Sequence, residues 1–290
     1  MSFKYSITLS SFRNIEAMEK TLERLVYQGY DAVEMYGEPE KLDIRVIRET
    51  LSSFDMTVCG ITGMWGTSGY DEAHKRNLIS CNQGILKYSK EYVKQCIKLC
   101  HGLGGKELNL CLFADDDLVA FDRNHIILAD INKTRLIQKL LLPVLYELTR
   151  FAEDHGIMLL LEPLNRYSTP YCTTAKDAVA IAKKVNHSNF GILLDTFHMN
   201  IEEDSFKQAI LISANLLGHT HFADNNRKMP GYAHIDFELV VKSLSHIKYN
   251  GYISFEPILN NESLTSTKQG LKFIKSLARN NQTNQQEQTQ

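Results

Sequence analysis

The sequence predicts an α/β protein folded as one (β/α)8 TIM barrel. Short runs rich in β-branched and aromatic residues alternate with amphipathic stretches along nearly the whole chain. Eight such units in 290 residues match the count and the length of a TIM barrel. The rival fold, an open doubly wound sheet, normally has a glycine-rich turn after its first strand. Here "LSSFRN" follows the first strand without a glycine, which favours the barrel.

The eight strands are expected where the apolar runs are short, as in buried parallel sheets. These runs lie at residues 5–9, 31–36, 57–62, 107–113, 157–162, 190–195, 218–223 and 252–256.

Helices are expected between these runs, where apolar residues recur at helical spacing. Residues 14–30 form the first such stretch, which Gly29 should end. Residues 134–156 form a long stretch, and Pro143 predicts a kink there or a division into two segments. Asp236 is a candidate N-cap of a later helix.

Two long segments interrupt the alternation, at residues 63–82 and 114–132. Long loops after barrel strands usually cover the mouth of the active site, so both are expected there. The polar, low-complexity end of the chain predicts disorder. We therefore expect a single barrel domain at 1–279 and a disordered tail at 280–290.

The composition is typical of a soluble globular protein, with 43% hydrophobic and 23% charged residues. A net charge of −2 without a basic block argues against a nucleic-acid partner. No apolar run approaches the roughly 20 residues that span a bilayer, and the start lacks a signal pattern. The six cysteines form no CxxC pair. These features predict a cytoplasmic protein that acts away from membranes.

Four metal-ligating residue types stand at the ends of four successive predicted strands: Glu162, Asp195, His221 and Glu256. Each alone also fits a cap or a solvated loop entry, but in a barrel these strand ends form one rim. Three converging carboxylates would repel one another unless a cation lay between them. Oxygen ligands with one imidazole suit Mn²⁺, Mg²⁺, Co²⁺ or Zn²⁺. His198, in the turn after Asp195, is a candidate substrate contact or a capping residue.

Four stretches around these residues resemble one superfamily. They are "LEPLNRY", "LDTFHMNIEE", "GHTHFADNNR" and "GYISFEP". They are similar to the xylose-isomerase-like sugar isomerases and epimerases, and within them to the ketose 3-epimerases that act on D-tagatose, D-psicose or L-ribulose. The similarity is densest from Glu162 to Glu256.

The resemblance implies a xylose-isomerase-like barrel that binds one divalent ion, foremost Mn²⁺, through the four strand-end residues. It implies that Glu162 and Glu256 are also the acid/base pair for C3 epimerisation of a ketose through a cis-enediolate. His198 and Arg227 match positions that grip the sugar. A small-molecule sugar is thus the expected partner, and a homodimer or homotetramer the expected assembly.

Three further residues are candidates for substrate binding. Ser168 stands where the epimerase pattern usually has a second glutamate, six residues after the first, so the particular sugar and the reaction stay open. Trp65, in the first long segment, is expected to form an apolar wall against the sugar. Glu34, at the end of the second strand, is expected either to reach the pocket or to have a structural role.

Three alternatives remain. The first is another isomerase on the same metal site, of the aldose–ketose, inosose or hydroxypyruvate type. The second is an endonuclease IV-like apurinic endonuclease. That enzyme needs three zinc ions and histidines from the third and fourth strands, which this sequence lacks there. The third is a non-catalytic sugar-binding barrel, which the retention of all four metal positions disfavours.

Overall fold

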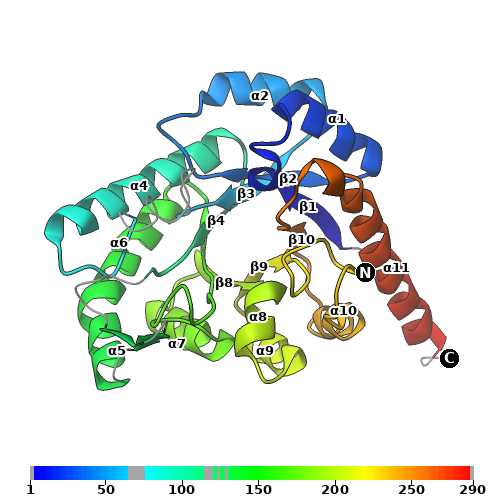
Figure 1. Ribbon diagram of the computed structural model, residues 1–290. Helices are drawn as coiled ribbons and strands as arrows, with labels where there is room; N and C mark the ends of the chain where they lie inside the picture. The colour runs from blue at the N-terminus through cyan, green and yellow to red at the C-terminus, as the bar shows by residue number, and fades with distance from the viewer. Residues whose placement is uncertain (1–2, 65–75, 114–119, 123–124, 128–129, 288–290) are drawn as a thin grey trace.

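The computed structural model describes residues 3–64, 76–113, 120–122, 125–127 and 130–287. Eight parallel strands close into a barrel in the order β1-β10-β9-β8-β7-β4-β3-β2, which confirms the predicted fold class. Figure 1 shows these strands with helices arranged around them. The strands are β1 (Lys4–Thr8), β2 (Ala32–Tyr36), β3 (Val58–Thr62), β4 (Glu107–Leu110), β7 (Met158–Leu161), β8 (Phe190–Asp195), β9 (Leu217–Phe222) and β10 (Tyr252–Phe255).

The helices expected within residues 14–30 and 134–156 and after Asp236 are present, and side-chain caps define several helix ends. The Asp236 carboxylate accepts a hydrogen bond from the Leu239 N–H, so the predicted N-cap is confirmed. Gly29 ends the first helix with a φ of 85°, in the left-handed region that glycine adopts readily. The helices are η1 (Leu9–Phe12), α1 (Met18–Gln28), α2 (Ile44–Ser53), α4 (Gln83–Gly102), α7 (Ala175–Val185), α8 (Thr196–Glu202), α9 (Phe206–Ser213), α10 (Phe237–His246), η3 (Asn261–Ser263) and α11 (Ser266–Glu287).

The long stretch around Pro143 is divided, as predicted. It consists of α5 (Asp130–Leu136), a π-helical turn (Ile137–Leu141) and α6 (Leu142–Glu153), with the proline in the first turn of α6. Proline is tolerated there because its missing N–H has no partner in the first turn of a helix. The π-helical turn before it has a wider hydrogen-bond spacing than an α-helix and so shifts the helical hydrogen-bond pattern ahead of the proline.

The two interrupting segments are described only in part. The second contains a short antiparallel hairpin, β5 (Ala120–Asp122) and β6 (His125–Ile127), before it enters α5. The first includes residues 65–75, among them Trp65, which lie outside the described residues. The fourth strand is also shorter than predicted, because its ladder with β7 ends at Leu110 rather than at residue 113.

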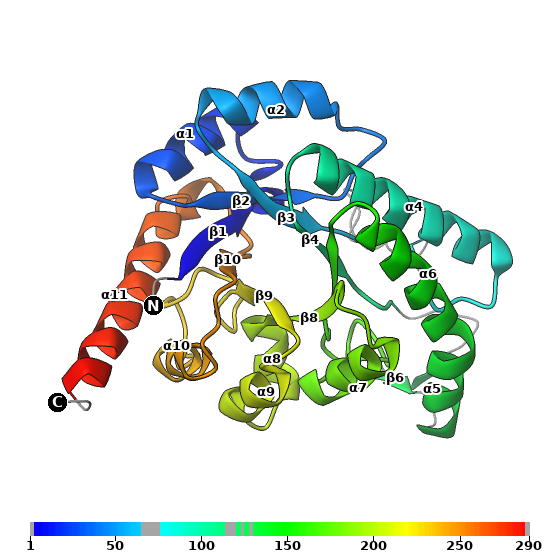
Figure 2. The same ribbon diagram turned by 180° about the vertical axis from the view of Figure 1, so that it is seen from behind.

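The expected tail is helical for most of its length. α11 continues to Glu287, into the segment for which the polar sequence predicts a disordered tail. Asn281 is buried, and its Nδ2 lies 3.3 Å from Ser245 Oγ of α10. Glutamine has good helix propensity, so a polar sequence can extend a helix that packing has already started. Figure 2 shows α11 as the last helix of the outer layer, next to α1 and α10.

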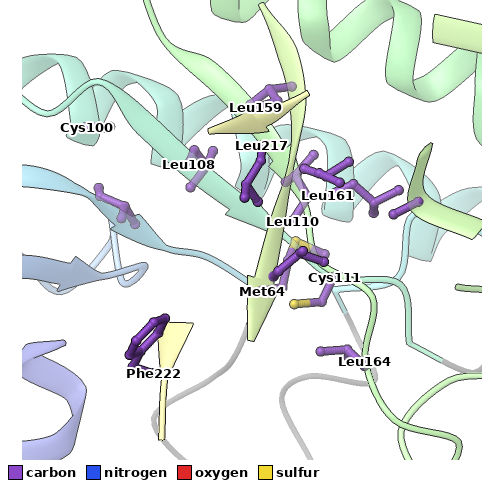
Figure 3. Close-up of a cluster of buried hydrophobic side chains, with 14 of the residues drawn as sticks. Met64, Cys100, Leu108, Leu110, Cys111, Leu159, Leu161, Leu164, Leu217 and Phe222 are labelled. Carbon is purple, nitrogen blue, oxygen red and sulfur yellow. The ribbon is translucent and has the colours of Figure 1, made fainter. Parts of the chain in front are cut away.

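Alternation along the strands separates an apolar outer face from a polar interior. Leu108 and Leu110 of β4 and Leu159 and Leu161 of β7 pack against the surrounding layer, and Figure 3 shows part of this cluster. Asn109 and Glu162 point the opposite way and contact each other inside the barrel. Polar side chains from several strands are thereby gathered on the barrel axis.

Among the described residues, none of the helices combines the length and the hydrophobicity of a membrane span.

Candidate metal and sugar site

The four strand-end residues come together at the carboxyl end of the barrel. Glu162 follows β7, Asp195 ends β8, His221 lies in β9 and Glu256 follows β10. One potential ligand atom from each lies within 4.8 Å of the others. Because these four strands are consecutive neighbours in the barrel, their ends necessarily form one continuous arc.

Glu162 is held through one of its two carboxylate oxygens. Its Oε2 accepts hydrogen bonds from Asn109 Nδ2 at 2.7 Å and from Cys111 Sγ at 3.3 Å. Its Oε1 is buried without a hydrogen-bond partner in the described part of the chain and faces His221 Nδ1 at 3.8 Å. Asn109 and Cys111 were missed in the sequence, although both follow the same alternation at the end of β4.

The two carboxylate oxygens of Asp195, at the end of β8, make different contacts. Its Oδ1 accepts the Phe197 N–H at 2.8 Å and so caps α8. Its Oδ2 faces the site and lies 3.9 Å from His198 Nε2. The capping and site roles considered from the sequence therefore coexist in one carboxylate.

Arg227 reaches the same cluster from the loop after β9. Its guanidinium donates to Asp195 Oδ2 and Glu256 Oε2 and stacks over the Phe197 ring at 4.8 Å. Its backbone has a φ of 59°. The arginine thus joins two of the four strand-end residues and also lines the adjacent cavity.

Asp224 shapes the loop that presents Arg227. Its Oδ2 accepts the N–H groups of Gly231 and Ala233, and its Oδ1 accepts that of Ile235. The Arg227 N–H donates to the Asp224 carbonyl at 2.8 Å. Sequence reasoning missed Asp224. The signal for it was an aspartate followed by a polar, glycine-containing segment, which is typical of a side-chain-organised loop.

A cavity of about 540 Å³ opens above the cluster, within the range of about 300–1,000 Å³ for small-molecule pockets. Glu162 and Glu256 lie on its inner wall, together with three predicted substrate contacts: Ser168, His198 and Arg227. The rest of the wall comes largely from the segment after β1 and the segment after β10, which supply Ser10, Ser11, Asn14, Ile15, Pro257, Ile258 and Leu259.

One of the predicted substrate contacts, Glu34, does not line this wall. Glu34 is 2% exposed and lies inside the barrel, where it contacts His219, His221 and Ser254. The structure therefore places Glu34 beneath the cluster rather than among the residues that line the cavity. Trp65 lies outside the described residues, so its role stays a prediction.

The charges of the cluster are strongly coupled. Burial opposes the ionisation of Glu162, but the nearby His221 imidazole outweighs it and lowers the pKa. Burial also opposes ionisation of Glu256, yet His221 and Arg227 lower its pKa as well. For Asp195, burial dominates over Arg227 and His198, so the pKa is raised. The cluster thus concentrates negative charge that depends on nearby cations.

The donor set fits a divalent ion. Glu162 Oε1 and His221 Nδ1 are both buried without hydrogen bonds among the described residues, and both face the centre of the cluster. Three carboxylates with one imidazole form an oxygen-rich set, which suits Mn²⁺ or Mg²⁺ better than a thiolate-preferring ion. A second group of possible ligands, Glu34, His219 and His221, shares the same histidine, but its carboxylate is already hydrogen-bonded.

Comparison with known proteins relates both the fold and the sequence to sugar epimerases. The xylose isomerase-like TIM barrel family model matches residues 22–277. The chain is 29% identical over 244 residues to a D-psicose 3-epimerase of Ruminiclostridium cellulolyticum, covering 82% of this chain and 77% of that protein. It is 26% identical over 232 residues to an L-ribulose 3-epimerase of Methylomonas sp., covering 79% and 74%.

A solved structure agrees in fold. The structure of D-psicose 3-epimerase with D-tagatose from Clostridium cellulolyticum H10 superimposes with a TM-score of 0.78 at 24% identity. The match covers 95% of this chain and 99% of that one. The barrel and its surrounding helices are therefore shared over nearly the full length of both chains.

Proposed function

We propose, from the premise that this chain belongs to the xylose isomerase-like TIM barrel family, that it is a metal-dependent ketose 3-epimerase. Its relatives are named epimerases, and the chain is accordingly a sugar isomerase or epimerase. The observation that carries the C3 proposal is the placement of two glutamates. Glu162 and Glu256 follow strands separated by β8 and β9, and both line one cavity.

Epimerisation beside a ketone requires proton transfer on two faces of one carbon. One group removes the C3 proton, and a second group returns a proton to the opposite face of the resulting cis-enediolate. Glu162 and Glu256 approach the cavity from different strands and are suited to the two roles. Aldose–ketose isomerisation can instead use one base on one face, so it makes less use of this pair.

The other residues bind and orient the sugar. His198 and Arg227 line the cavity and offer N–H donors to the carbonyl and hydroxyl oxygens, where negative charge develops. Glu162, Asp195, His221 and Glu256 would hold a divalent ion, with Mn²⁺ as the first candidate. When bound, that ion supplies Lewis-acid stabilisation of the developing oxyanion.

Ser168 leaves the substrate class wider than for a typical epimerase site. It lines the cavity with a hydroxyl in place of the usual carboxylate, so that one charged contact to the sugar is lost. Isomerisation of an inosose, of hydroxypyruvate, or between an aldose and a ketose is therefore the alternative reaction if the protein does not epimerise ketoses at C3. The endonuclease alternative is disfavoured because the third and fourth strands supply no histidine. His234, which follows β9, is exposed and belongs to neither potential ligand group of the described residues.

We also propose that the protein is a homodimer or homotetramer in the cytoplasm and binds neither membranes nor nucleic acid. Light scattering coupled to size-exclusion chromatography measures the assembly. A monomer at all concentrations would contradict the first part of this proposal.

The test of function follows deuterium exchange in D₂O by NMR, with the Mn²⁺-loaded protein and a panel of free ketoses. We expect deuterium at C3 together with a new C3 epimer. Glu162→Gln and Glu256→Gln should each abolish the interconversion of the two epimers. If a variant still exchanges the C3 proton of one epimer, the remaining glutamate is the base on that face of C3. Exposed Tyr167→Phe is the control variant. Metal content is measured in parallel, because both glutamates are also proposed ligands. Exchange at C1 or C2 with aldose formation would replace epimerisation by isomerisation.

A further inference from the structure

Glu34 and His221 meet across the inside of the barrel. Glu34 belongs to β2 and His221 to β9, which are separated in the closed sheet by β1 and β10. Their contact, between Glu34 Oε2 and His221 Nε2, measures 3.0 Å and joins residues 187 positions apart. Both are buried, with 2% and 0% exposure. A pairing this deep in the barrel is shielded from water and therefore retains its geometry.

The contact determines which nitrogen of His221 carries a hydrogen. A carboxylate accepts hydrogen bonds and does not donate them, so Nε2 is the protonated nitrogen. Ser254 Oγ donates to the same Glu34 oxygen at 2.9 Å, which fixes the carboxylate from β10. In the neutral ring, the lone pair then lies on Nδ1.

Nδ1 is the nitrogen that faces the metal cluster. It lies 3.1 Å from Glu256 Oε2 and 3.8 Å from Glu162 Oε1. It has no hydrogen bond among the residues that the structure describes. The two nitrogens of His221 therefore face two different carboxylate environments, one below the ring and one above it.

We propose that Glu34 is a positioning residue that presents His221 Nδ1 as a metal ligand. This inference rests on the proposed metal-dependent function and assigns Glu34 a role beneath the site instead of a contact with the sugar. Histidines that bind metals commonly donate their second N–H to a carboxylate, which fixes the tautomer and raises ligand basicity. Ser254 supports the same carboxylate in this arrangement.

The polar network offers a matched control. His219 Nε2 lies 3.3 Å from Glu34 Oε2, and His219 Nδ1 lies 2.7 Å from Glu107 Oε2. Glu107 is thus part of the same network, but its carboxylate contacts His219 rather than His221. A general loss of internal charge should therefore affect variants of both glutamates, whereas a specific role in orienting His221 should affect only those of Glu34.

The test measures the Kd for Mn²⁺ by isothermal titration calorimetry of the full chain, without sugar. Glu34→Ala should weaken binding by about 10–100-fold, the usual effect of losing such an outer partner. Glu34→Gln keeps an oxygen acceptor for the Nε2–H and should recover part of this loss. Glu107→Gln should bind Mn²⁺ like the unaltered protein. Long-range ¹H–¹⁵N NMR should show the Nε2–H tautomer of His221 in the unaltered protein and a mixture of tautomers in Glu34→Ala.

Two results would overturn the proposal. One is Mn²⁺ binding by Glu34→Gln and Glu34→Ala that equals that of the unaltered protein. The other is an equal loss in Glu107→Gln, which would indicate a general effect of the network.

If Glu34→Ala does not fold, the near-isosteric Glu34→Gln and Ser254→Ala, each with a smaller expected loss, carry the comparison. If the unaltered protein itself binds no Mn²⁺, the metal-dependent function fails first. If it binds Mn²⁺ and epimerises while the Glu34 variants bind equally well, only this inference fails.

Discussion

Asn165 makes two contacts with one ring nitrogen of His198. Its main-chain N–H donates to His198 Nδ1 at 3.2 Å, and its side-chain Nδ2 lies 2.9 Å from the same atom. A main-chain N–H can only donate, so Nδ1 accepts and the hydrogen of the neutral ring lies on Nε2. Since His198 lines the cavity, it presents an N–H donor for a sugar oxygen.

Replacing Asn165 should therefore weaken sugar turnover without changing the acid/base pair. Asn165→Ala removes the side-chain contact and is expected to lower kcat/KM by roughly tenfold, equivalent to about 1–2 kcal/mol. Steady-state kinetics on the preferred ketose measure it. Exposed Tyr167→Phe, outside the cavity wall, is the comparison. In a His198→Ala background, Asn165→Ala should have almost no further effect. A full additional loss there would show that Asn165 acts independently of His198.

Metal removal should destabilise the fold. An ion at about 100 times its Kd stabilises the folded state by about 2.7 kcal/mol. For a chain of 290 residues that corresponds to a rise in Tm of about 4–5 °C. Differential scanning calorimetry with EDTA and with added Mn²⁺ measures this difference. Asp195→Asn should shrink it, whereas Glu147→Gln, on the outer helices, should retain it. An unchanged Tm after chelation would argue against a resident ion.

The cysteines should differ sharply in reactivity. Cys81 is exposed, while the other five are buried. Burial raises the pKa of the Cys96 and Cys100 thiols to about 12, so little thiolate forms at neutral pH. Ellman's reagent should modify one thiol rapidly in the folded protein and six after denaturation. Cys81→Ser should remove the rapid phase. A second rapid thiol in that variant would contradict the buried placement.

The pair of Glu16 and Arg24 should make stability dependent on pH. Arg24 Nε and Nη2 donate to the two Glu16 oxygens at 3.0 and 2.8 Å, and this bond lowers the pKa of Glu16. Because the folded pKa lies below the unfolded one, the stabilisation is present above the unfolded pKa, about 4.3, and is lost as the pH falls through the folded pKa. Glu16→Gln should cost up to about 1 kcal/mol at pH 7.

Urea unfolding at pH 7, 5 and 3 measures this effect. The difference between Glu16→Gln and the unaltered protein should shrink at pH 3, where the carboxyl group is protonated in both states. Exposed Glu23→Gln is the control and should be close to the unaltered protein throughout. A constant penalty at all three pH values would show that packing, rather than charge, accounts for the loss.

Sequence reasoning reached the features that depend on local pattern. Strand ends can be read from apolar runs, and parallel strands place their carboxyl ends on one rim, so the convergence of Glu162 and Asp195 could be expected. The contact of Glu34 with His221 could not, because it depends on which side chains meet across the barrel interior. Polarity alone likewise does not distinguish the end of a packed helix such as α11 from a disordered tail.

The four proposed ligands all come from β7 to β10, which form one half of the closed ring. Residues on the segment after β1, such as Ser10, Asn14 and Ile15, instead contribute to the cavity wall. The segment after β1 thereby shapes part of the cavity without supplying a proposed metal ligand or either of the two glutamates. A mutant library confined to the segment after β1 can alter which sugar is accepted while the reactive half stays intact, so that segment is the natural starting point for directed evolution.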